Sequence, residues 1–133
     1  MNAKAVQYVS YCGLSCKRCW GLTASLSKAA QSLREAVKRV GLKEFWHEIP
    51  FLGSYEQFKK SLDGLMRLHC TKTCRKGGGN PDCKIRECVR AKKSIGCWEC
   101  LGFKKCGKLH KKFVRNLNRI RKVGPARFLR EAK

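Results

Sequence analysis

The run CKIRECVRAKKSIGCWECLGFKKC, residues 83–106, places five cysteines in a segment that is otherwise rich in lysine and arginine. Two of them, Cys97 and Cys100, have the C-x-x-C spacing that lets one turn direct two thiolates at one metal. A second pair with the same spacing, Cys16 and Cys19, lies near the start of the chain. The spacing predicts a small fold in which thiolates bind metal.

The full cysteine set is larger than one tetrahedral site can use. Two further pairs, Cys12 with Cys16 and Cys70 with Cys74, are four residues apart, which suits one face of a helical turn. Two four-coordinate sites would use eight of the ten sulfurs and leave two as core residues or bridging ligands. The spacing does not pair the cysteines into sites. The candidate metal ligands are therefore Cys12, Cys16, Cys19, Cys70, Cys74, Cys83, Cys88, Cys97, Cys100 and Cys106.

Zinc is the metal that this donor set favours, because soft thiolates in a closed tetrahedron suit it. We expect two zinc ions. A [4Fe–4S] cluster also takes four thiolates and is the alternative, although the C-x2-C-x2-C-x3-C run of bacterial ferredoxins is absent. Cys106 and His110 are spaced as a helical ligand pair, but a solvated position on a basic helix is the simpler reading of His110.

The sequence lacks the features of exported and membrane-inserted proteins. No apolar h-region follows Met1, and the longest stretch without a charge, Ala5 to Cys16, is twelve residues where a bilayer span needs about 18–20. We therefore expect a cytoplasmic protein with reduced thiols and no membrane association. A disulfide scaffold, as in intracellular proteins of hyperthermophiles, is the alternative use of the cysteines.

Positive charge is concentrated in the second half of the chain. The 133 residues have a formal net charge of +22, with 31 Lys and Arg against 9 Asp and Glu. Residues 1–69 carry 11 basic and 5 acidic side chains, whereas residues 70–133 carry 20 basic and 4 acidic ones. Self-repulsion on this scale destabilises a compact state unless a polyanion or bound metal offsets it. The distribution predicts a polyanionic partner.

The hydrophobic pattern predicts a mainly α protein: a small cysteine-rich, metal-stapled domain with short helices and irregular zinc-binding loops. We expect a single domain over 1–133, with a mostly helical half over 1–69 that includes the N-terminal cysteine motif, a cysteine-rich metal-binding region over 70–107, and a basic C-terminal helix and tail over 108–133.

Within these regions, apolar residues recur at helical spacing from residue 22 to 40, where Gly41 ends the pattern, and again from 54 to 68. Ser54 and Gln57 have capping-box spacing at the start of the second stretch. The apolar residues between the two helices, from Phe45 to Leu52, are expected in the core. A third helix is expected over 108–123 and should stop at Gly124-Pro125.

The C-terminal helix is the predicted surface for the polyanion, because its apolar stripe is narrow and basic residues occupy its other faces. Structured RNA fits better than duplex DNA, since the sequence has no C2H2 finger spacing, basic zipper or convincing helix-turn-helix. We expect contacts with rRNA phosphates in a ribosomal or ribosome-associated protein. The predicted RNA-binding residues are Lys104, Lys105, Lys108, Lys111, Lys112, Arg115, Arg119, Arg121, Lys122, Arg127 and Arg130.

The alternative function is a soluble zinc, iron–sulfur or thiol redox protein that does not bind RNA. Basic neighbours of the cysteines would favour reactive thiolates, but no βαβ pattern surrounds either C-x-x-C pair. An enzyme is not expected, because the H-E-x-x-H motif and the deaminase pair H-x-E with P-C-x-x-C are absent. No small-molecule substrate is evident.

The ordered cysteine motifs resemble a known family. The stretch YCGLSCKRC, residues 11–19, is similar to the opening signature of the prokaryotic domain-of-unknown-function family numbered 3795. Its later motifs are similar to CKIREC at 83–88, GCWEC at 96–100 and FKKC at 103–106, and its tail to NLNRI at 116–120. The resemblance covers nearly the whole chain. It implies a small, cysteine-rich, metal-binding protein without an established activity.

One motif departs from the family pattern. Members commonly have acidic residues and a proline around the last cysteine, whereas this chain has GFKKC at 102–106. The replacement inverts the local charge, which suggests a metal scaffold that has acquired a surface for a polyanion.

Overall fold

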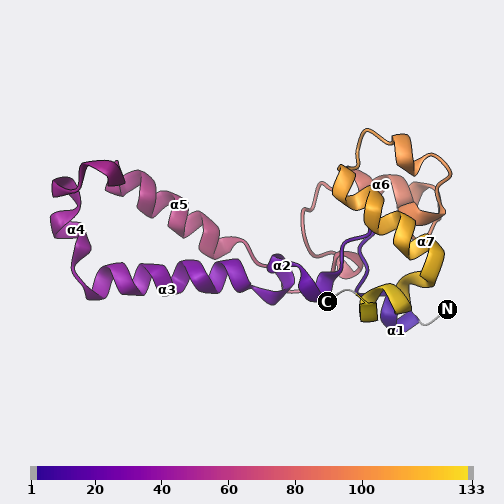
Figure 1. The fold of residues 1–133 in the computed structure, drawn as a ribbon, viewed down its shortest axis with the longest axis horizontal. Helices are drawn as coiled ribbons and strands as arrows, with labels where there is room; N and C mark the ends of the chain where they lie inside the picture. Colours follow the sequence, from indigo (N-terminus) through magenta and orange to yellow (C-terminus); the bar gives the residue numbers. More distant parts are fainter. Residues whose placement is uncertain (1–2, 132–133) are drawn as a thin grey trace.

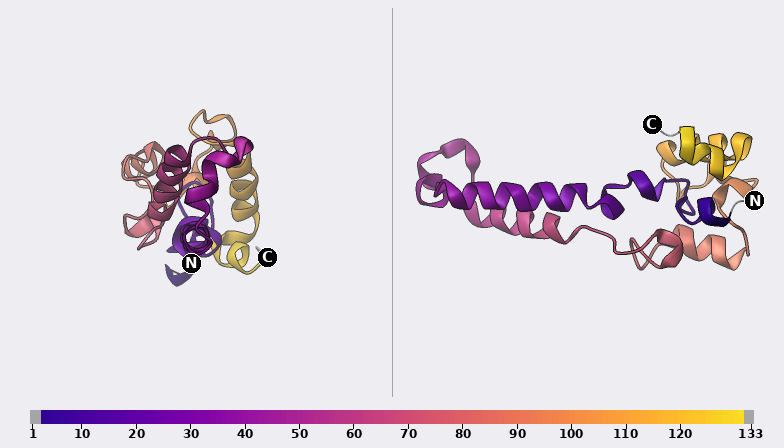
Figure 2. Two further views of the ribbon diagram at one scale, coloured as in Figure 1. Left: turned by 90° about the vertical axis from the view of Figure 1, so that its left-hand side faces the viewer. Right: turned by 90° about the horizontal axis from the view of Figure 1, so that it is seen from below.

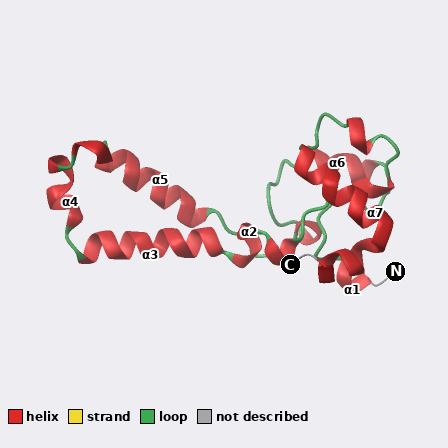
Figure 3. Cartoon of the chain, viewed as in Figure 1, coloured by secondary structure: helices red, strands yellow, loops and turns green. Residues whose placement is uncertain are grey.

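The structure is a computed structural model that describes residues 3–131, and it is mainly α, as the sequence predicts. The α-helices, in chain order, are α1 (Ala3–Val6), α2 (Trp20–Thr23), α3 (Ser25–Arg39), α4 (Leu42–Phe45), α5 (Tyr55–Arg67), α6 (Lys84–Ala91) and α7 (Lys111–Glu131). The 3-10 turns between them are η1 (Cys16–Arg18), η2 (Trp46–Glu48), η3 (Pro50–Leu52), η4 (Cys74–Lys76), η5 (Cys97–Glu99) and η6 (Phe103–Lys105). Figure 3 shows helices joined by loops, and the β-type pairing found within residues 3–131 is an isolated bridge between Val9 and Ser15.

The chain forms two regions of different shape. Residues 25–67, here called the hairpin, contain α3 and α5 side by side and project away from the rest, as Figures 1 and 2 show. Residues 3–24 and 68–131, here called the cysteine lobe, contain α1, α2, α6 and α7. A hydrogen bond of 2.8 Å from the Cys70 N–H to the Gly21 C=O joins the two chain segments at the base of the hairpin.

The two long helices of the hairpin begin and end where local chemistry directs them. Gly41 has a φ of +63°, a left-handed conformation that glycine adopts without strain, and it follows the end of α3. The Ser54 hydroxyl accepts a hydrogen bond from the Gln57 N–H at 3.3 Å and caps α5. Both predictions from the sequence are confirmed.

The hairpin is held by contacts between the facing sides of α3 and α5. Ala30, Val37 and Leu62 are buried. The Ser27 hydroxyl donates a hydrogen bond of 2.7 Å to the Met66 carbonyl across the helix pair. This is an ordinary amphipathic helix pair, which buries one narrow stripe from each helix.

At the tip of the hairpin, the prediction that residues 45–52 lie in the core is partly wrong. Of the segment expected in the core, Trp46 is buried, with its ring 5.2 Å from Tyr55 and 4.7 Å from Phe58 between centroids. Phe45 and Phe51 are instead 54% and 87% exposed. The expectation is wrong for these two because a projecting tip has no further layer of protein to cover them.

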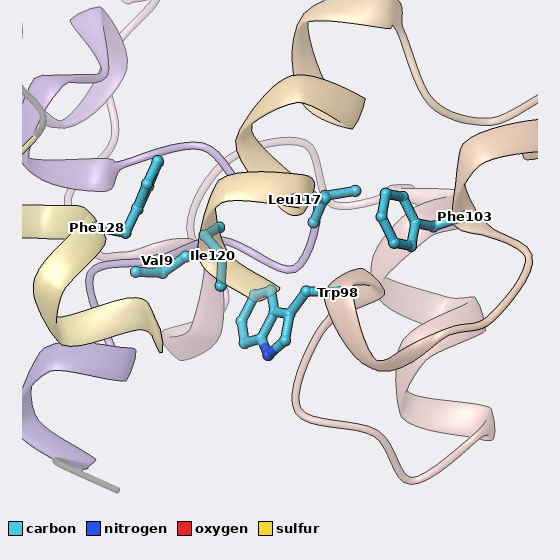
Figure 4. Close-up of a cluster of buried hydrophobic side chains, with 6 residues drawn as sticks. All are labelled: Val9, Trp98, Phe103, Leu117, Ile120 and Phe128. Carbon is cyan, nitrogen blue, oxygen red and sulfur yellow. The ribbon is translucent and has the colours of Figure 1, made fainter. Parts of the chain in front are cut away.

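The cysteine lobe has a small apolar core, which Figure 4 shows in close-up. It is assembled from four separate parts of the chain: the N-terminal segment, η5, η6 and α7. Its buried members are Val9, Trp98, Phe103, Leu117, Ile120 and Phe128. Because none of these segments could bury its apolar side alone, the lobe depends on long-range contacts.

Helix α7 differs from the expected helix at both ends. It begins at Lys111, so residues 108–110 precede it. Gly124 has non-helical torsion angles, φ 78° and ψ 158°, so the first segment stops where the sequence predicts. Pro125 then starts a second helical segment, which proline favours at a first helical position, and Phe128 from this segment enters the core. The residues expected to be a tail are therefore a packed helix as far as Glu131.

Arg86 is a basic side chain that points into the protein. It is 7% exposed, and its guanidinium donates to the carbonyls of Cys74 at 3.2 Å, Gly78 at 2.9 Å and Pro81 at 3.2 Å, and also to that of Asn80. The rigid fork of donors on arginine suits several carbonyls at once. Arg86 therefore fixes the glycine-rich loop beside the cysteines.

Arg75 has a comparable role on the other side of the loop. Its Nε donates to the carbonyls of Val6 and Val9 at 2.8 and 2.7 Å. Its guanidinium also lies over the rings of Tyr11 and Trp98, 4.6 and 5.5 Å from their centroids. It ties the N-terminal segment to the core.

Between residues 3 and 131, no helix is both long enough and apolar enough to span a bilayer.

Candidate metal centre and nucleic-acid interface

All ten cysteines lie in the cysteine lobe as free thiols. The structure sorts them into two groups of four and one pair. The first group is Cys16, Cys19, Cys70 and Cys74. The second group is Cys88, Cys97, Cys100 and Cys106. The pair is Cys12 and Cys83.

The first group is brought together at the base of the hairpin. Cys16 begins η1 and Cys74 begins η4, and their thiols are hydrogen-bonded to each other. A Cβ atom at Gly21 would lie 3.0 Å from the sulfur of Cys70 and 3.5 Å from that of Cys19. The absence of a side chain at Gly21 therefore lets these two sulfurs approach the same piece of backbone.

The hydrogen bond between Cys16 and Cys74 separates their proton affinities. Together with a backbone hydrogen bond to Cys74 and the positive charge of Arg75, it lowers the pKa of Cys16 to about 6 against the opposing effect of burial. The same bond raises the pKa of Cys74, and burial adds to the rise. One thiol of the pair is thus held as the thiolate, the form that binds metals.

The second group surrounds a cavity of about 230 Å³. Cys88 lies in α6 and Cys97 begins η5. Cys100 directly follows η5, and Cys106 directly follows η6. Four thiols from three consecutive structural elements therefore face one space. The two 3-10 turns supply this arrangement because each reverses the chain within a few residues.

The surroundings of this cavity are apolar on one side and cationic on the other. Val89 and Phe103 line it and are buried, with exposures of 4% and 1%. Lys92 and Lys108 also line it, and the Lys92 ammonium donates to the sulfur of Cys100 at 3.6 Å. The cavity can therefore accommodate an anionic group beside its apolar side chains.

Burial raises the pKa of Cys97 to about 12, and nearby thiols add to the rise. Those thiols are Cys12, Cys106, Cys88 and Cys100. A bound cation acts in the opposite direction, because a coordinating thiol loses its proton outright. Positive charge in the cavity would therefore favour the deprotonated form of Cys97.

Cys12 lies near members of both groups, and Cys83 lies near Cys12. Burial raises the pKa of Cys12, a hydrogen bond with the Ser10 hydroxyl at 3.1 Å opposes the rise, and Cys83 adds to it. Cys12 also raises the pKa values of Cys74 and Cys97, one from each group. These two are the cysteines in excess of two four-sulfur sites.

A single bound metal ion requires several ligand side chains arranged around one point. Over the described residues 3–131, no group of three or more histidine, cysteine, aspartate or glutamate side chains is arranged to hold a metal ion. Zinc–sulfur bonds of about 2.3 Å require sulfurs that converge on one point. The donor chemistry of both groups fits a thiophilic metal, and the first group, with two thiols in contact, is the nearer to convergence.

The predicted RNA-binding residues form the second candidate site. All of them are exposed: Lys104, Lys105, Lys108, Lys111, Lys112, Arg115, Arg119, Arg121, Lys122, Arg127 and Arg130. The first two lie in η6, and the last eight lie on α7. The cationic surface and the second cysteine group therefore share one part of the lobe.

The cations of the first α7 segment lie on one side of the helix. Lys111, Arg115 and Lys122 are spaced by four and seven residues, which places them on one face. Leu117 and Ile120 are buried on the opposite side. The helix thus uses one face for the core and leaves the other for a partner.

The acidic residue Glu131 neutralises part of this surface. Arg119 donates to it at 2.9 and 2.5 Å, and Arg127 donates to it at 2.6 Å. These hydrogen bonds hold the pKa of the Glu131 carboxyl below its usual value. Arg121 is engaged differently, with its guanidinium 5.5 Å from the centre of the Phe103 ring.

Three features of the site were not found from the sequence. The first feature is the grouping of the cysteines. The second is the inward direction of Arg75 and Arg86, which a charge count does not distinguish from other basic residues. The third is a hollow of about 590 Å³ along the hairpin, which contains no cysteine. His110 is exposed, packs its ring 5.4 Å from that of Phe113, and is not among the residues lining the cysteine cavity.

Comparison with the curated proteins and with the solved structures finds no match. Comparison with protein families matches residues 8–111 to a family described as "Protein of unknown function (DUF3795)". The matched stretch contains all ten cysteines and ends at Lys111, where α7 begins, so the NLNRI motif of α7 lies beyond it. The match confirms the family that the cysteine motifs indicated: the chain belongs to the DUF3795 family of proteins of unknown function.

Proposed function

We propose that the protein is a metal-binding RNA-binding protein that contacts phosphates of ribosomal RNA through α7 and the adjoining loop. The observation that supports this most directly is the cationic face of α7. Eleven exposed lysines and arginines lie between residues 104 and 130, with Glu131 as their acidic partner at the end of the helix.

The energetic argument is electrostatic. Each phosphate neutralised by lysine or arginine releases condensed counterions, so affinity arises without sequence reading. The planar guanidinium groups of Arg115 and Arg130, both exposed, can also bind phosphate by two hydrogen bonds or stack on an unpaired base. Structured rRNA offers phosphates and unpaired bases together.

The metal part of the proposal explains how so cationic a chain stays folded. Thiolate-bound metal would link the loops that carry α6, η5 and η6, and would present α7 on a rigid base. Zinc is the proposed ion for the first cysteine group, in a reducing cytoplasm. A structural and RNA-binding role, rather than catalysis, fits a chain without a hydrolase or deaminase motif.

A matched pair of charge variants tests the RNA interface. In the test variant Lys111, Lys112, Arg115 and Lys122 are replaced by Glu, and in the control Lys28, Lys38, Arg39 and Lys60 of the hairpin are replaced by Glu. All eight side chains are exposed, and both variants have a formal net charge of +14. Binding to purified ribosomal subunits is measured between about 50 and 200 mM salt, the range over which phosphate contacts weaken most visibly.

The test variant should lose affinity and its salt slope should fall by about 3, since each lost phosphate contact removes about 0.7–0.9. The control should keep the wild-type slope. Equal loss in both variants would mean that net charge alone drives association, and unchanged co-sedimentation of the test variant with the subunits would exclude α7 as the interface.

The alternative is a soluble thiol redox protein. The hydrogen-bonded thiols of Cys16 and Cys74 favour it, because a thiolate beside a thiol is the arrangement from which a disulfide forms. Thiol titration of the native protein separates the two: metal-bound cysteines react only after a chelator is added, whereas a redox pair reacts at once.

A further inference from the structure

The cavity of the second cysteine group has room for more than the single ion expected there. Its volume is about 230 Å³, whereas a space of about 10–15 Å³ already accommodates one water molecule. Four thiols, from Cys88, Cys97, Cys100 and Cys106, line this one space. The space beside these four residues therefore has room for a group of several atoms.

The two candidate groups, a single zinc ion and an iron–sulfur cluster, need different arrangements of their ligands. A single zinc ion needs its ligands to converge at bond lengths of about 2.3 Å. In the described part of the chain neither cysteine group has three ligands arranged in this way, so the two groups are distinguished by the cavity and not by convergence. A cubane of four irons and four sulfides instead carries one thiolate on each iron, so its four ligands stand apart around a body of finite size.

The walls of the cavity suit such a group. A [4Fe–4S] core of charge +2 with four thiolates carries a net charge of −2, and Lys92 and Lys108 border the cavity. The Lys92 ammonium lies 3.6 Å from the Cys100 sulfur, where hydrogen bonds tune the reduction potential of a cluster. Val89 and Phe103 also line the cavity and are buried apolar side chains.

We propose that Cys88, Cys97, Cys100 and Cys106 bind a [4Fe–4S] cluster, in place of the second zinc ion expected from the sequence. The proposal deepens the metal part of the proposed function and is independent of RNA binding. Assembly uses two ferrous ions, two ferric ions and four sulfides, which give the core of charge +2, and the four thiols release their protons to solvent. The juxtaposition that carries the proposal is four thiols around one roomy, partly cationic cavity.

The two C-x-x-C pairs supply a matched control. The full chain, reduced and freed of metal, is reconstituted without oxygen from ferrous and ferric iron and sulfide. Iron and acid-labile sulfide per chain are measured for wild type, for Cys97→Ser with Cys100→Ser, and for Cys16→Ser with Cys19→Ser. Wild type and the Cys16/Cys19 variant should bind about four of each, and the Cys97/Cys100 variant should lose them.

A second variant keeps every ligand and covers the case in which a double variant fails to fold. Lys92→Leu removes the cation beside Cys100, so the reduction potential of the cluster should become more negative. Lys84→Leu, at the first residue of α6 and outside the lining of the cavity, should leave the potential unchanged. Three results would each overturn the proposal. The first is wild-type protein that binds iron but no acid-labile sulfide. The second is an equal loss of iron and sulfide in both double variants with no shift of the reduction potential in Lys92→Leu, and the third is one tightly held zinc ion in this group after purification. Loss of RNA binding with the cluster intact would contradict the proposed function alone.

Discussion

The hairpin and the cysteine lobe are stabilised in different ways. In the hairpin two regular helices bury a narrow stripe, and the chain turns at a glycine and starts again at a capping serine. In the lobe short helical turns are joined by loops, and the buried Arg86, the half-buried Arg75 and largely half-buried thiols lie between them. The comparison teaches that helix pairing can rest on local rules, whereas a lobe of this kind depends on links between distant residues.

The comparison gives a functional division as well. The lobe holds all ten cysteines and the cationic face of α7, and the family match covers the cysteines. The hairpin carries mixed charges and exposed aromatic residues at its tip, among them Phe51. Changes in the two regions should therefore have separable effects on metal content, RNA binding and stability.

Removal of the proposed metal should have the largest effect. Binding of a structural zinc ion by small metal domains contributes about 10–16 kcal/mol, more than the whole stability of most domains. After chelation under reducing conditions, backbone amides of α6 and α7 should exchange with solvent, while those of α3 and α5 stay protected. Hydrogen exchange read by mass spectrometry resolves the two regions. Simultaneous loss of protection in both would show that the hairpin depends on the lobe.

Replacement of Arg86 by Met should be the most damaging single change in the lobe. It leaves four backbone carbonyls without their charged donor, and the expected loss is about 3–5 kcal/mol of unfolding free energy. Arg90→Met on the same helix is the control, since Arg90 is exposed. Urea unfolding of the metal-loaded protein measures both, and equal midpoints would show that the carbonyl contacts of Arg86 are dispensable.

Leu62→Ala should weaken the hairpin without touching the lobe. Leu62 is 5% exposed, and deletion of a buried leucine side chain costs about 2–5 kcal/mol. Metal content and RNA affinity should stay at their wild-type values, because neither candidate site includes residues of this helix. Phe51→Ala, at a position 87% exposed, is the control and should change stability by less than about 0.5 kcal/mol.

Ser54→Ala should have the smallest effect. It removes the hydroxyl that accepts from the Gln57 N–H at the start of α5, which costs about 1 kcal/mol. Ser61→Ala, an exposed position inside the same helix, removes a hydroxyl without removing a cap and should be neutral or slightly stabilising. Thermal unfolding of the two variants side by side gives the difference, and identical midpoints would contradict the capping role.

The elements best predicted from the sequence are those governed by neighbouring residues. The periodic stretches around α3 and α5, the turn at Gly41, the cap at Ser54 and the break at Gly124 all have signals within a few positions of where they occur. The errors fall where the answer depends on what lies across from a residue. Phe45 and Phe51 are apolar and yet exposed, because the tip projects into solvent.

The sequence by itself determined the family, the helical class, the thiol-rich donor set and the basic surface, because composition and short-range spacing fix each of them. Only the tertiary structure decided how the cysteines group. Cys70 meets Cys19 at Gly21 although some fifty residues separate them, and Cys88 shares a cavity with Cys106. The same holds for Arg75 and Arg86, whose inward direction depends on carbonyls supplied by other segments. Spacing constrains only residues within one or two turns of each other, and contacts between distant residues are set by how the whole chain packs.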